Sequence, residues 1–191
     1  SNVGYKTKGG HLTSPDTQTN WNGITGRIEL IGYKNAHAEN VMLWCDIHSK
    51  TVRVTANITG GKSGKAVISA ESFNSEKSHT PEVQSFEYTD GKLDALYKMG
   101  NDCLLWSEHE PNLYKLRIDI DGDVSEHIIG MREFNTEGGK FTINGEKTFL
   151  RGKHDGMIFP KTAFAPTDLE EWLRVMKISK SYGMNHYRYH T

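Results

Sequence analysis

The chain has 191 residues, with 23 basic and 24 acidic side chains and a formal net charge of −1. This balance argues against a nucleic-acid or anionic-membrane binder, because such proteins carry an excess of basic side chains. Hydrophobic residues at 36% and charged residues at 25% indicate a globular chain. No apolar run reaches the ~18 residues of a membrane span, and the first residues lack a signal-peptide pattern.

Alternating apolar and polar residues predict short β-strands over much of the chain. The clearest stretch is 51–58, in which every second residue is apolar. Asp121-Gly122 predicts a hairpin turn, because both turn positions favour positive φ. In chain order, the expected strands are 27–31, 51–58, 66–70, 85–88, 103–106, 114–120 and 125–134. Short strands at this spacing are typical of an antiparallel β-sandwich.

The pattern changes at residue 141. Residues 141–147 predict a small hairpin with its turn at Asn144-Gly145, and 148–152 predict one more strand. Residues 185–190 are again strand-like.

A helix is expected between these last two strands. Thr167 and Glu170 have the spacing of a capping box, and Gly183 suits a helix C-terminus. Strand, helix and strand with a short return make a βαβ unit, which implies a parallel pair.

A single βαβ unit leaves two sheet edges and one sheet face uncovered, so it is not expected to be stable alone. We therefore expect the chain to be a piece of a larger protein, cut inside an α/β domain. The alternative is that the last ~50 residues pack on the sandwich as an α+β appendage.

Cys45 and Cys103 are the two cysteines, and their spacing matches no CxxC motif. They are either two buried thiols or one bridge between sandwich strands, which requires an oxidising compartment. The nine histidines include no HExxH pair, and we expect neither a metal nor a cofactor.

Several runs of residues occur in one order along the chain. They are Asn20 to Ile24, Leu105 to Tyr114, Ile129 to Phe134, Phe141 to Gly145 with Phe149 to Gly152, and Gly183 to His190. Together they resemble glycoside hydrolase family 2, the family of β-galactosidases, β-glucuronidases and β-mannosidases. The resemblance extends from Asn20 to the end, about nine tenths of the chain.

The resemblance implies a mainly β fold, an immunoglobulin-like antiparallel β-sandwich followed by an incomplete βαβ piece of a (β/α)8 barrel. Residues 1–25 are then the tail of a jelly-roll sugar-binding domain or a linker. Residues 26–135 are the sandwich, and residues 136–191 are the truncated start of the barrel.

Members of the family are retaining glycosidases, which use two carboxyl groups about 5–5.5 Å apart. The resemblance places these glutamates after barrel strands four and seven. Since this chain is expected to reach only strand two, we expect it to contain no catalytic residue and to be inactive, although the parent protein is a glycoside hydrolase.

Barrel sites form at the C-terminal ends of the strands. The resemblance therefore implies four substrate-binding residues in the intact enzyme, Arg188, His190, His154 and Asp155. An arginine there can hold the nucleophilic carboxylate ionised, and histidines can hydrogen-bond sugar hydroxyls. The alternative is that His154 and Asp155 are polar residues that stabilise a loop.

The expected partner is a carbohydrate substrate bound by the intact parent, without nucleic acid or membrane, and homo-oligomerisation stays open. A periplasmic or extracellular parent is favoured over a cytoplasmic one.

Two further hypotheses are a stand-alone immunoglobulin-like carbohydrate- or protein-binding module and a purely structural spacer. The sequence does not specify which β-linked sugar is bound.

Overall fold

The structure is a computed structural model that describes residue 24 and residues 26–156, 159, 161–162 and 165–189. It divides into two compact units, residues 31–149 and residues 1–30 with 150–191. No helix among the described residues has the length and apolar character needed to cross a membrane.

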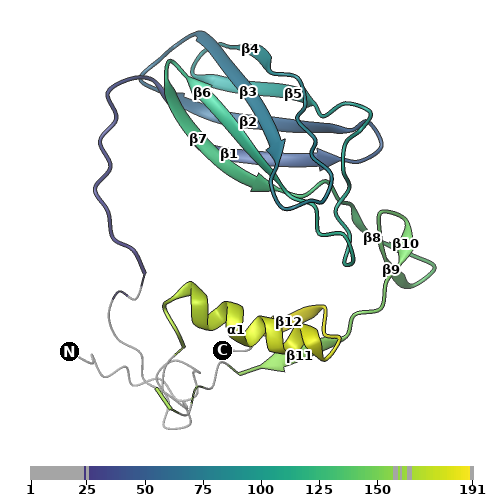
Figure 1. Ribbon diagram of the computed structural model, residues 1–191. Helices are drawn as coiled ribbons and strands as arrows, with labels where there is room; N and C mark the ends of the chain where they lie inside the picture. The colour runs from purple at the N-terminus through teal and green to yellow at the C-terminus, as the bar shows by residue number, and fades with distance from the viewer. Residues whose placement is uncertain (1–23, 25, 157–158, 160, 163–164, 190–191) are drawn as a thin grey trace. The chain divides into compact units, whose positions relative to one another are not determined.

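The unit 31–149 contains a sandwich of a three-stranded and a four-stranded antiparallel sheet (Figure 1). The sheet orders are β1-β2-β5 and β4-β3-β6-β7. The strands are β1 (His37–Asp46), β2 (Thr51–Thr59), β3 (Gly64–Ser72), β4 (Gln84–Tyr88), β5 (Lys92–Lys98), β6 (Tyr114–Ile120) and β7 (Asp123–Ile129). The mainly β sandwich predicted from the sequence is confirmed.

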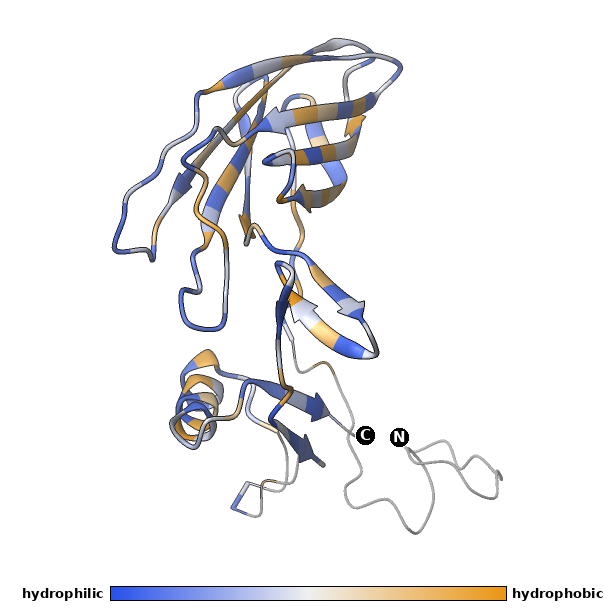
Figure 2. Cartoon of the chain, turned by 90° about the vertical axis from the view of Figure 1, so that its right-hand side faces the viewer, coloured by the Kyte–Doolittle hydropathy of each residue, from blue (hydrophilic) through white to orange (hydrophobic). Residues whose placement is uncertain are grey.

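The core is formed by alternate residues of strands in both sheets, and Figure 2 shows the resulting alternation of hydrophobic and hydrophilic positions. Burying one face of each sheet against the other supplies most of the stabilisation of such a sandwich. The largest fully buried side chains are those of Tyr88, Tyr97, Tyr114, Ile68, Leu93, Met99, Leu116, Ile118, Ile120, Met131, Val52 and Val54.

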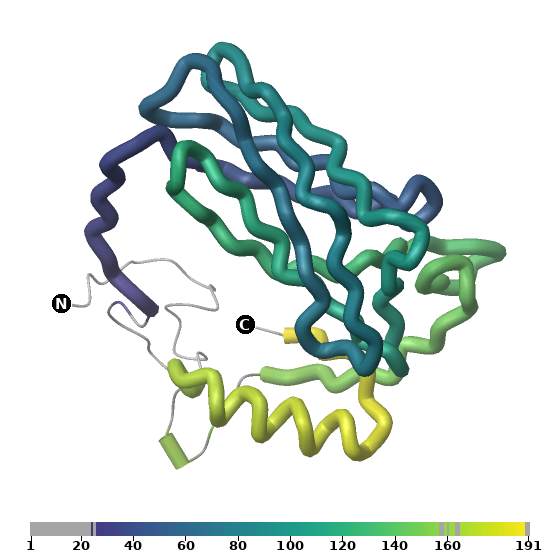
Figure 3. The backbone as a smooth tube through the Cα atoms, turned by 45° about the horizontal axis from the view of Figure 1, so that its top comes forward, coloured from purple at the N-terminus to yellow at the C-terminus, as the bar shows by residue number. Residues whose placement is uncertain are grey.

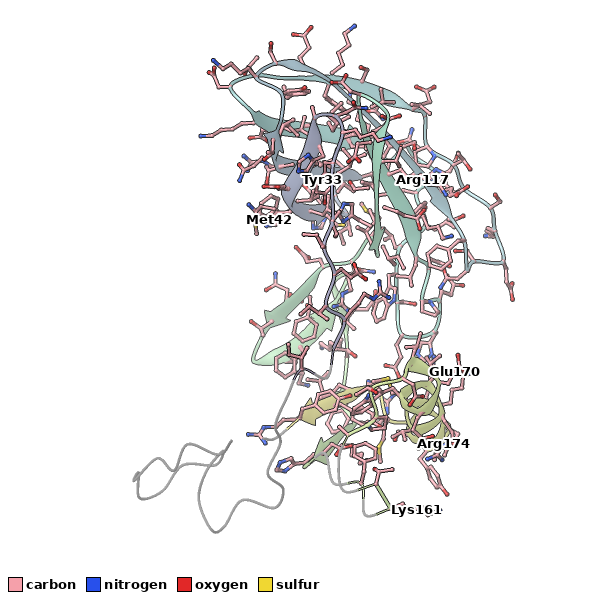
Figure 4. The ribbon with its side chains drawn as sticks, turned by 90° about the vertical axis from the view of Figure 1, so that its left-hand side faces the viewer. Tyr33, Met42, Arg117, Lys161, Glu170 and Arg174 are labelled. Carbon is pink, nitrogen blue, oxygen red and sulfur yellow. The ribbon has the colours of Figure 1, made fainter. Side chains whose placement is uncertain are left out.

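The outer faces of the two sheets differ in chemistry, and Figure 4 shows Met42 and Arg117 on opposite sides of the sandwich. Arg117 forms ion pairs with Glu71 and Glu126, so the four-stranded sheet carries an ion-pair network. The three-stranded sheet exposes Met42, Trp44 and Leu96 around an Arg53–Asp94 pair.

Two of the expected strands are wrong, and the strand expected at 125–134 ends at Ile129. Residues 27–31 form no strand, and residues 103–106 contribute only isolated bridges. The sequence analysis missed β1, whose alternation is interrupted by an irregularity between Glu39 and Met42. It also missed β5, in which buried Ala95 and exposed Leu96 make two successive apolar positions.

The two predicted tight turns are confirmed. Asp121 and Gly122 both have positive φ, 51° and 85°, between β6 and β7. Asn144 and Gly145 have φ of 53° and 80° between β9 (Lys140–Ile143) and β10 (Glu146–Lys147). With β8 (Phe134–Glu137), the last two strands form a small antiparallel sheet.

Three of the runs that carry the family resemblance meet around Trp106. Its backbone N–H donates to the carbonyl of Met131 at 2.9 Å, and the Arg132 guanidinium lies 4.7 Å from its ring centroid. The Asn144 side chain donates to the carbonyl of Trp106 and accepts from the N–H of Glu133, both at 2.9 Å. Asn144 thus links the hairpin to two segments of the sandwich unit.

The buried hydroxyl of Tyr114 ties the start of β6 to two other segments. It accepts a hydrogen bond from the N–H of Leu104 at 2.8 Å. It also shares a hydrogen bond with Nδ1 of His79, at 2.7 Å. Burial lowers the pKa of His79 below its ordinary value of 6.5.

Both cysteines are free thiols in the structure, so the expected alternative of a bridge is not formed. Burial raises the pKa of Cys45 to about 11 and also raises the pKa of Cys103. Both are therefore thiols, with little thiolate, at neutral pH.

In the second unit, β11 (Gly152–Asp155) and β12 (His186–Tyr189) pair in parallel, and α1 (Leu169–Ser181) connects them. Figure 3 shows α1 running beside the two strands. The predicted βαβ pattern is therefore present, although the expected strand at 148–152 lies instead at 152–155.

The predicted helix N-cap is wrong by one residue. Asp168, not Thr167, has the extended backbone of an N-cap, and its carboxylate accepts from the N–H of Glu171 at 2.9 Å. The carboxylate also suits the positive end of the helix dipole. The predicted C-terminal glycine is confirmed, since Gly183 has φ of 79°.

We expect the stability of the sandwich to fall as the pH drops below about 6.5. Burial lowers the pKa of both His79 and His127, so the unfolded chain takes up protons that the folded chain resists. The two neutral histidines contribute fully to the free energy of unfolding above the pKa of an unfolded histidine. This contribution is lost as the pH falls toward their lower pKa values in the folded protein. Urea unfolding at pH 5 to 8 checks this. A His79→Gln, His127→Gln chain with an equally steep profile would contradict the assignment.

A second prediction distinguishes the two candidate caps. Asp168→Ala removes the acceptor for Glu171 and should destabilise α1 by about 1 kcal/mol. Thr167→Ala is the matched control and should have little effect, because the Thr167 side chain is exposed. Amide hydrogen exchange of α1 measures both. An equal or larger effect of Thr167→Ala would show that Thr167 is the N-cap, as the capping-box pattern predicted.

Candidate functional site

The candidate site lies on the β11–β12 pair, whose register places His154 opposite Arg188 and Asp155 opposite Tyr189. Successive residues of a strand point to opposite faces of a sheet. One face of the pair therefore carries His154 and Arg188, and the other carries Lys153, Asp155, Tyr187 and Tyr189.

The second face is the one that packs on α1. The hydroxyl of Tyr187 donates to the Ser179 hydroxyl, and the ring of Tyr189 meets that of Trp172 edge-on, with centroids 5.9 Å apart. Trp172 is itself held by a hydrogen bond from Nε1 to the carbonyl of Pro166. Tyr187 and Tyr189 thereby fix the orientation of the pair against the helix.

An ion pair between a partly exposed lysine and a buried carboxylate lies on this helix-facing side. Nζ of Lys153 is 2.8 Å from a carboxylate oxygen of Asp155, whose exposed fraction is 7%. The same ammonium lies 5.4 Å from the ring centroid of Tyr187. The hydrogen bond to Asp155 is the main cause that raises the pKa of Lys153. Asp155 is therefore committed to Lys153 within the helix-facing layer.

On the opposite face, Nη1 of Arg188 lies 3.0 Å from Nε2 of His154. A guanidinium has donors only, so the histidine nitrogen must accept this hydrogen bond. The contact thus requires a neutral His154 that carries its proton on Nδ1. It fixes the direction of the Arg188 side chain on a face that α1 leaves open.

Gly152 lies on the same face, under the ring of His186. A Cβ atom at position 152 would fall inside the contact distance of the imidazole, so this position has room only for glycine. Nδ1 of His186 is buried and has no hydrogen-bond partner in the part of the chain that the structure describes. The ring is held by packing on the glycine.

The structure brings together two of the four residues that the resemblance implied, His154 and Arg188. Asp155 belongs to the same pair but lies on the other face, and His190 lies outside the described residues. Sequence reasoning missed Gly152 and Lys153. A glycine within a strand is a signal of close approach by another group, and could have pointed to Gly152.

The described residues include no group of three or more His, Cys, Asp or Glu side chains placed to hold a metal ion. On the open face, the Arg188 guanidinium offers hydrogen-bond donors and a positive charge. Both suit hydroxyl groups and carboxylates.

Comparison with known proteins gives a consistent result. The family model described as "Glycosyl hydrolases family 2" matches residues 36–132. A β-galactosidase of Leuconostoc mesenteroides is 24% identical over 153 residues, which is 73% of this chain and 15% of that protein. A β-galactosidase of Staphylococcus xylosus is 34% identical over 64 residues, 34% of this chain and 6% of that protein.

Solved structures show the same fold. A β-glucuronidase of Faecalibacterium prausnitzii has a TM-score of 0.65 at 15% identity, covering 81% of this chain and 24% of its own. A β-galacturonidase of Eisenbergiella tayi, bound to galacturonate, has a TM-score of 0.60 at 18% identity, covering 82% and 28%. The chain thus spans a minor part of each of these relatives.

We expect Gly152→Ala to disrupt the β11–β12 pair by about 1–3 kcal/mol, because the added methyl group displaces the His186 ring. Adding His186→Ala should restore room and recover much of the loss. Gly32→Ala is the control, since no atom lies within 4 Å of its added Cβ. Amide exchange of β12 measures the effect. Unchanged protection in Gly152→Ala would show that the contact is unimportant.

Proposed function

The chain belongs to glycosyl hydrolases family 2, and from this membership we propose that it is a non-catalytic middle region of a retaining β-glycosidase. Its sandwich positions the catalytic barrel of the parent, and β11, α1 and β12 begin that barrel. The proposal keeps residues 26–135 as the immunoglobulin-like sandwich, residues 136–191 as the barrel start, and residues 1–25 as the end of a jelly roll or a linker.

One observation carries the barrel proposal, the position of α1 on one face of a parallel strand pair. In a (β/α)8 barrel the helices form the outer ring, so the opposite face of each strand lines the interior. His154 and Arg188 lie on the face away from α1, near the C-terminal ends of their strands. That is the end at which barrel active sites form.

The proposed roles follow from this placement. The Arg188 guanidinium would pair with the nucleophilic carboxylate of the parent and favour its ionised form. His154, whose ring Arg188 fixes, would hydrogen-bond a sugar hydroxyl. Asp155 would act as a positioning residue, because its carboxylate holds the Lys153 ammonium close to the ring of Tyr187 on β12. His190, outside the described residues, enters the proposal from its sequence position alone.

The strands themselves support an inactive chain. Retaining glycosidases need two carboxyl groups about 5–5.5 Å apart. Within β11 and β12, Asp155 is the sole carboxylate, and it faces α1. The proposal therefore places the two catalytic carboxylates outside β11 and β12. A stand-alone binding module, the alternative expected from the sequence, gives no role to a capped helix followed by a strand that pairs in parallel.

The test compares this chain with its full-length parent on aryl β-galactosides and aryl β-glucuronides. We expect turnover by the parent alone. In the parent, Arg188→Ala should lower kcat by about 100-fold or more, because it removes a charge next to the reacting carboxylate.

The control is Arg174→Ala, since Arg174 pairs with Glu171 on the exposed side of α1 (Figure 4) and should leave turnover unchanged. Turnover by the 191-residue chain alone would refute the non-catalytic role. Full activity of the Arg188→Ala parent would refute the pocket role.

A further inference from the structure

A cleft of about 700 Å³ opens in the sandwich between the ends of β4 and β5, the edge strands of the two sheets. Its volume is in the range of small-molecule sites. The cleft is lined by His79, Thr80, Pro81, Glu82, Gln84, Ser85, Phe86, Leu96, Lys98, Met99, Gly100, Asn101 and Asp102. None of these belongs to the β11–α1–β12 unit, so the cleft is separate from the site described above.

Three charged side chains line the cleft, those of Glu82, Asp102 and Lys98. Among the described residues none of the three forms a hydrogen bond or ion pair, although the charge of Asp102 partly offsets the effect of burial on the pKa of His79. This contrasts with the outer faces of both sheets, where Arg53 and Arg117 are paired with acidic side chains. The cleft therefore retains free acceptors and a free donor.

The same cleft has an apolar wall. Met99 is fully buried and Pro81 is buried, whereas Leu96 remains 54% exposed. Phe86 is half-buried beside them. A ligand in the cleft would thus meet a hydrocarbon surface on one side and unpaired polar groups on the other.

Hydrogen bonds fix the walls of the cleft in place. The Gln84 carboxamide bonds both the N–H and the carbonyl of Lys98, at 3.0 and 2.8 Å. The hydroxyl of Tyr97 donates to the carbonyl of Glu82 at 3.0 Å, and Lys50 donates to the carbonyl of Asn101. These bonds hold the backbone on both sides of the cleft and leave the charged side chains available. Binding of a ligand would therefore lose little conformational entropy of the protein.

From these groups we infer that the cleft binds a mono- or disaccharide. Two carboxylates and one ammonium offer acceptors and donors side by side, which suits a ligand rich in hydroxyl groups, because a hydroxyl group both donates and accepts hydrogen bonds. Hydroxyl groups can donate to Glu82 and Asp102 and accept from Lys98, while the C–H face of a pyranose packs on Leu96 and Phe86. This inference does not depend on the proposed catalytic role of the parent.

The test is an NMR titration of the 191-residue chain with methyl β-galactoside, lactose and cellobiose, and with spermidine as a cationic probe. We expect saccharide binding on the order of millimolar, with amide shifts at cleft residues. Glu82→Gln and Asp102→Asn should each weaken it by about tenfold. Both side chains are exposed and form no hydrogen bond or ion pair among the described residues, so the variants should remain folded.

The control is Glu87→Gln, an exposed carboxylate on β4 that does not line the cleft and should not alter binding. The inference is overturned if no saccharide shifts the cleft amides, or if spermidine alone does. It is also overturned if Glu82→Gln and Asp102→Asn bind as well as Glu87→Gln.

Discussion

Successive side chains of a β-strand point to opposite faces, and this alternation determines which residues of the chain can act together. In the sandwich it sends Val52 and Val54 into the core and Arg53 to the outer face. In the β11–β12 pair it separates His154 from its neighbour Asp155. The face with His154 and Arg188 and the helix-facing side with Asp155 are therefore formed by alternate residues of the same two short strands.

This constraint explains which parts of the fold were predictable. Strands β2 and β6 alternate cleanly between core and solvent, so the sequence pattern reports their structure directly. In β1 the irregularity after Glu39 shifts the pattern, and in β5 an exposed Leu96 breaks it. Residues 27–31 have a strand pattern but pair with no strand among the described residues. An alternating pattern cannot predict whether a partner strand is present.

The candidate site was predictable to a different extent. The family resemblance pointed to His154 and Arg188, which the structure brings into contact. It grouped Asp155 with them, because a sequence motif does not record the face to which each residue points. The predicted helix cap was wrong for a related reason. Thr167 and Asp168 are both good caps, and only the backbone geometry of Asp168 decides between them.

The cluster around Trp106 has an evolutionary consequence. Asn144 satisfies the backbone of both Trp106 and Glu133, while Arg132 covers the Trp106 ring. A change at Asn144 leaves the backbone groups of both Trp106 and Glu133 without their partner, whereas Arg132 and Trp106 depend on each other's side chains. Across homologous proteins Asn144 should therefore be retained, and Arg132 and Trp106 should change together, even where the sugar specificity of the enzymes has diverged.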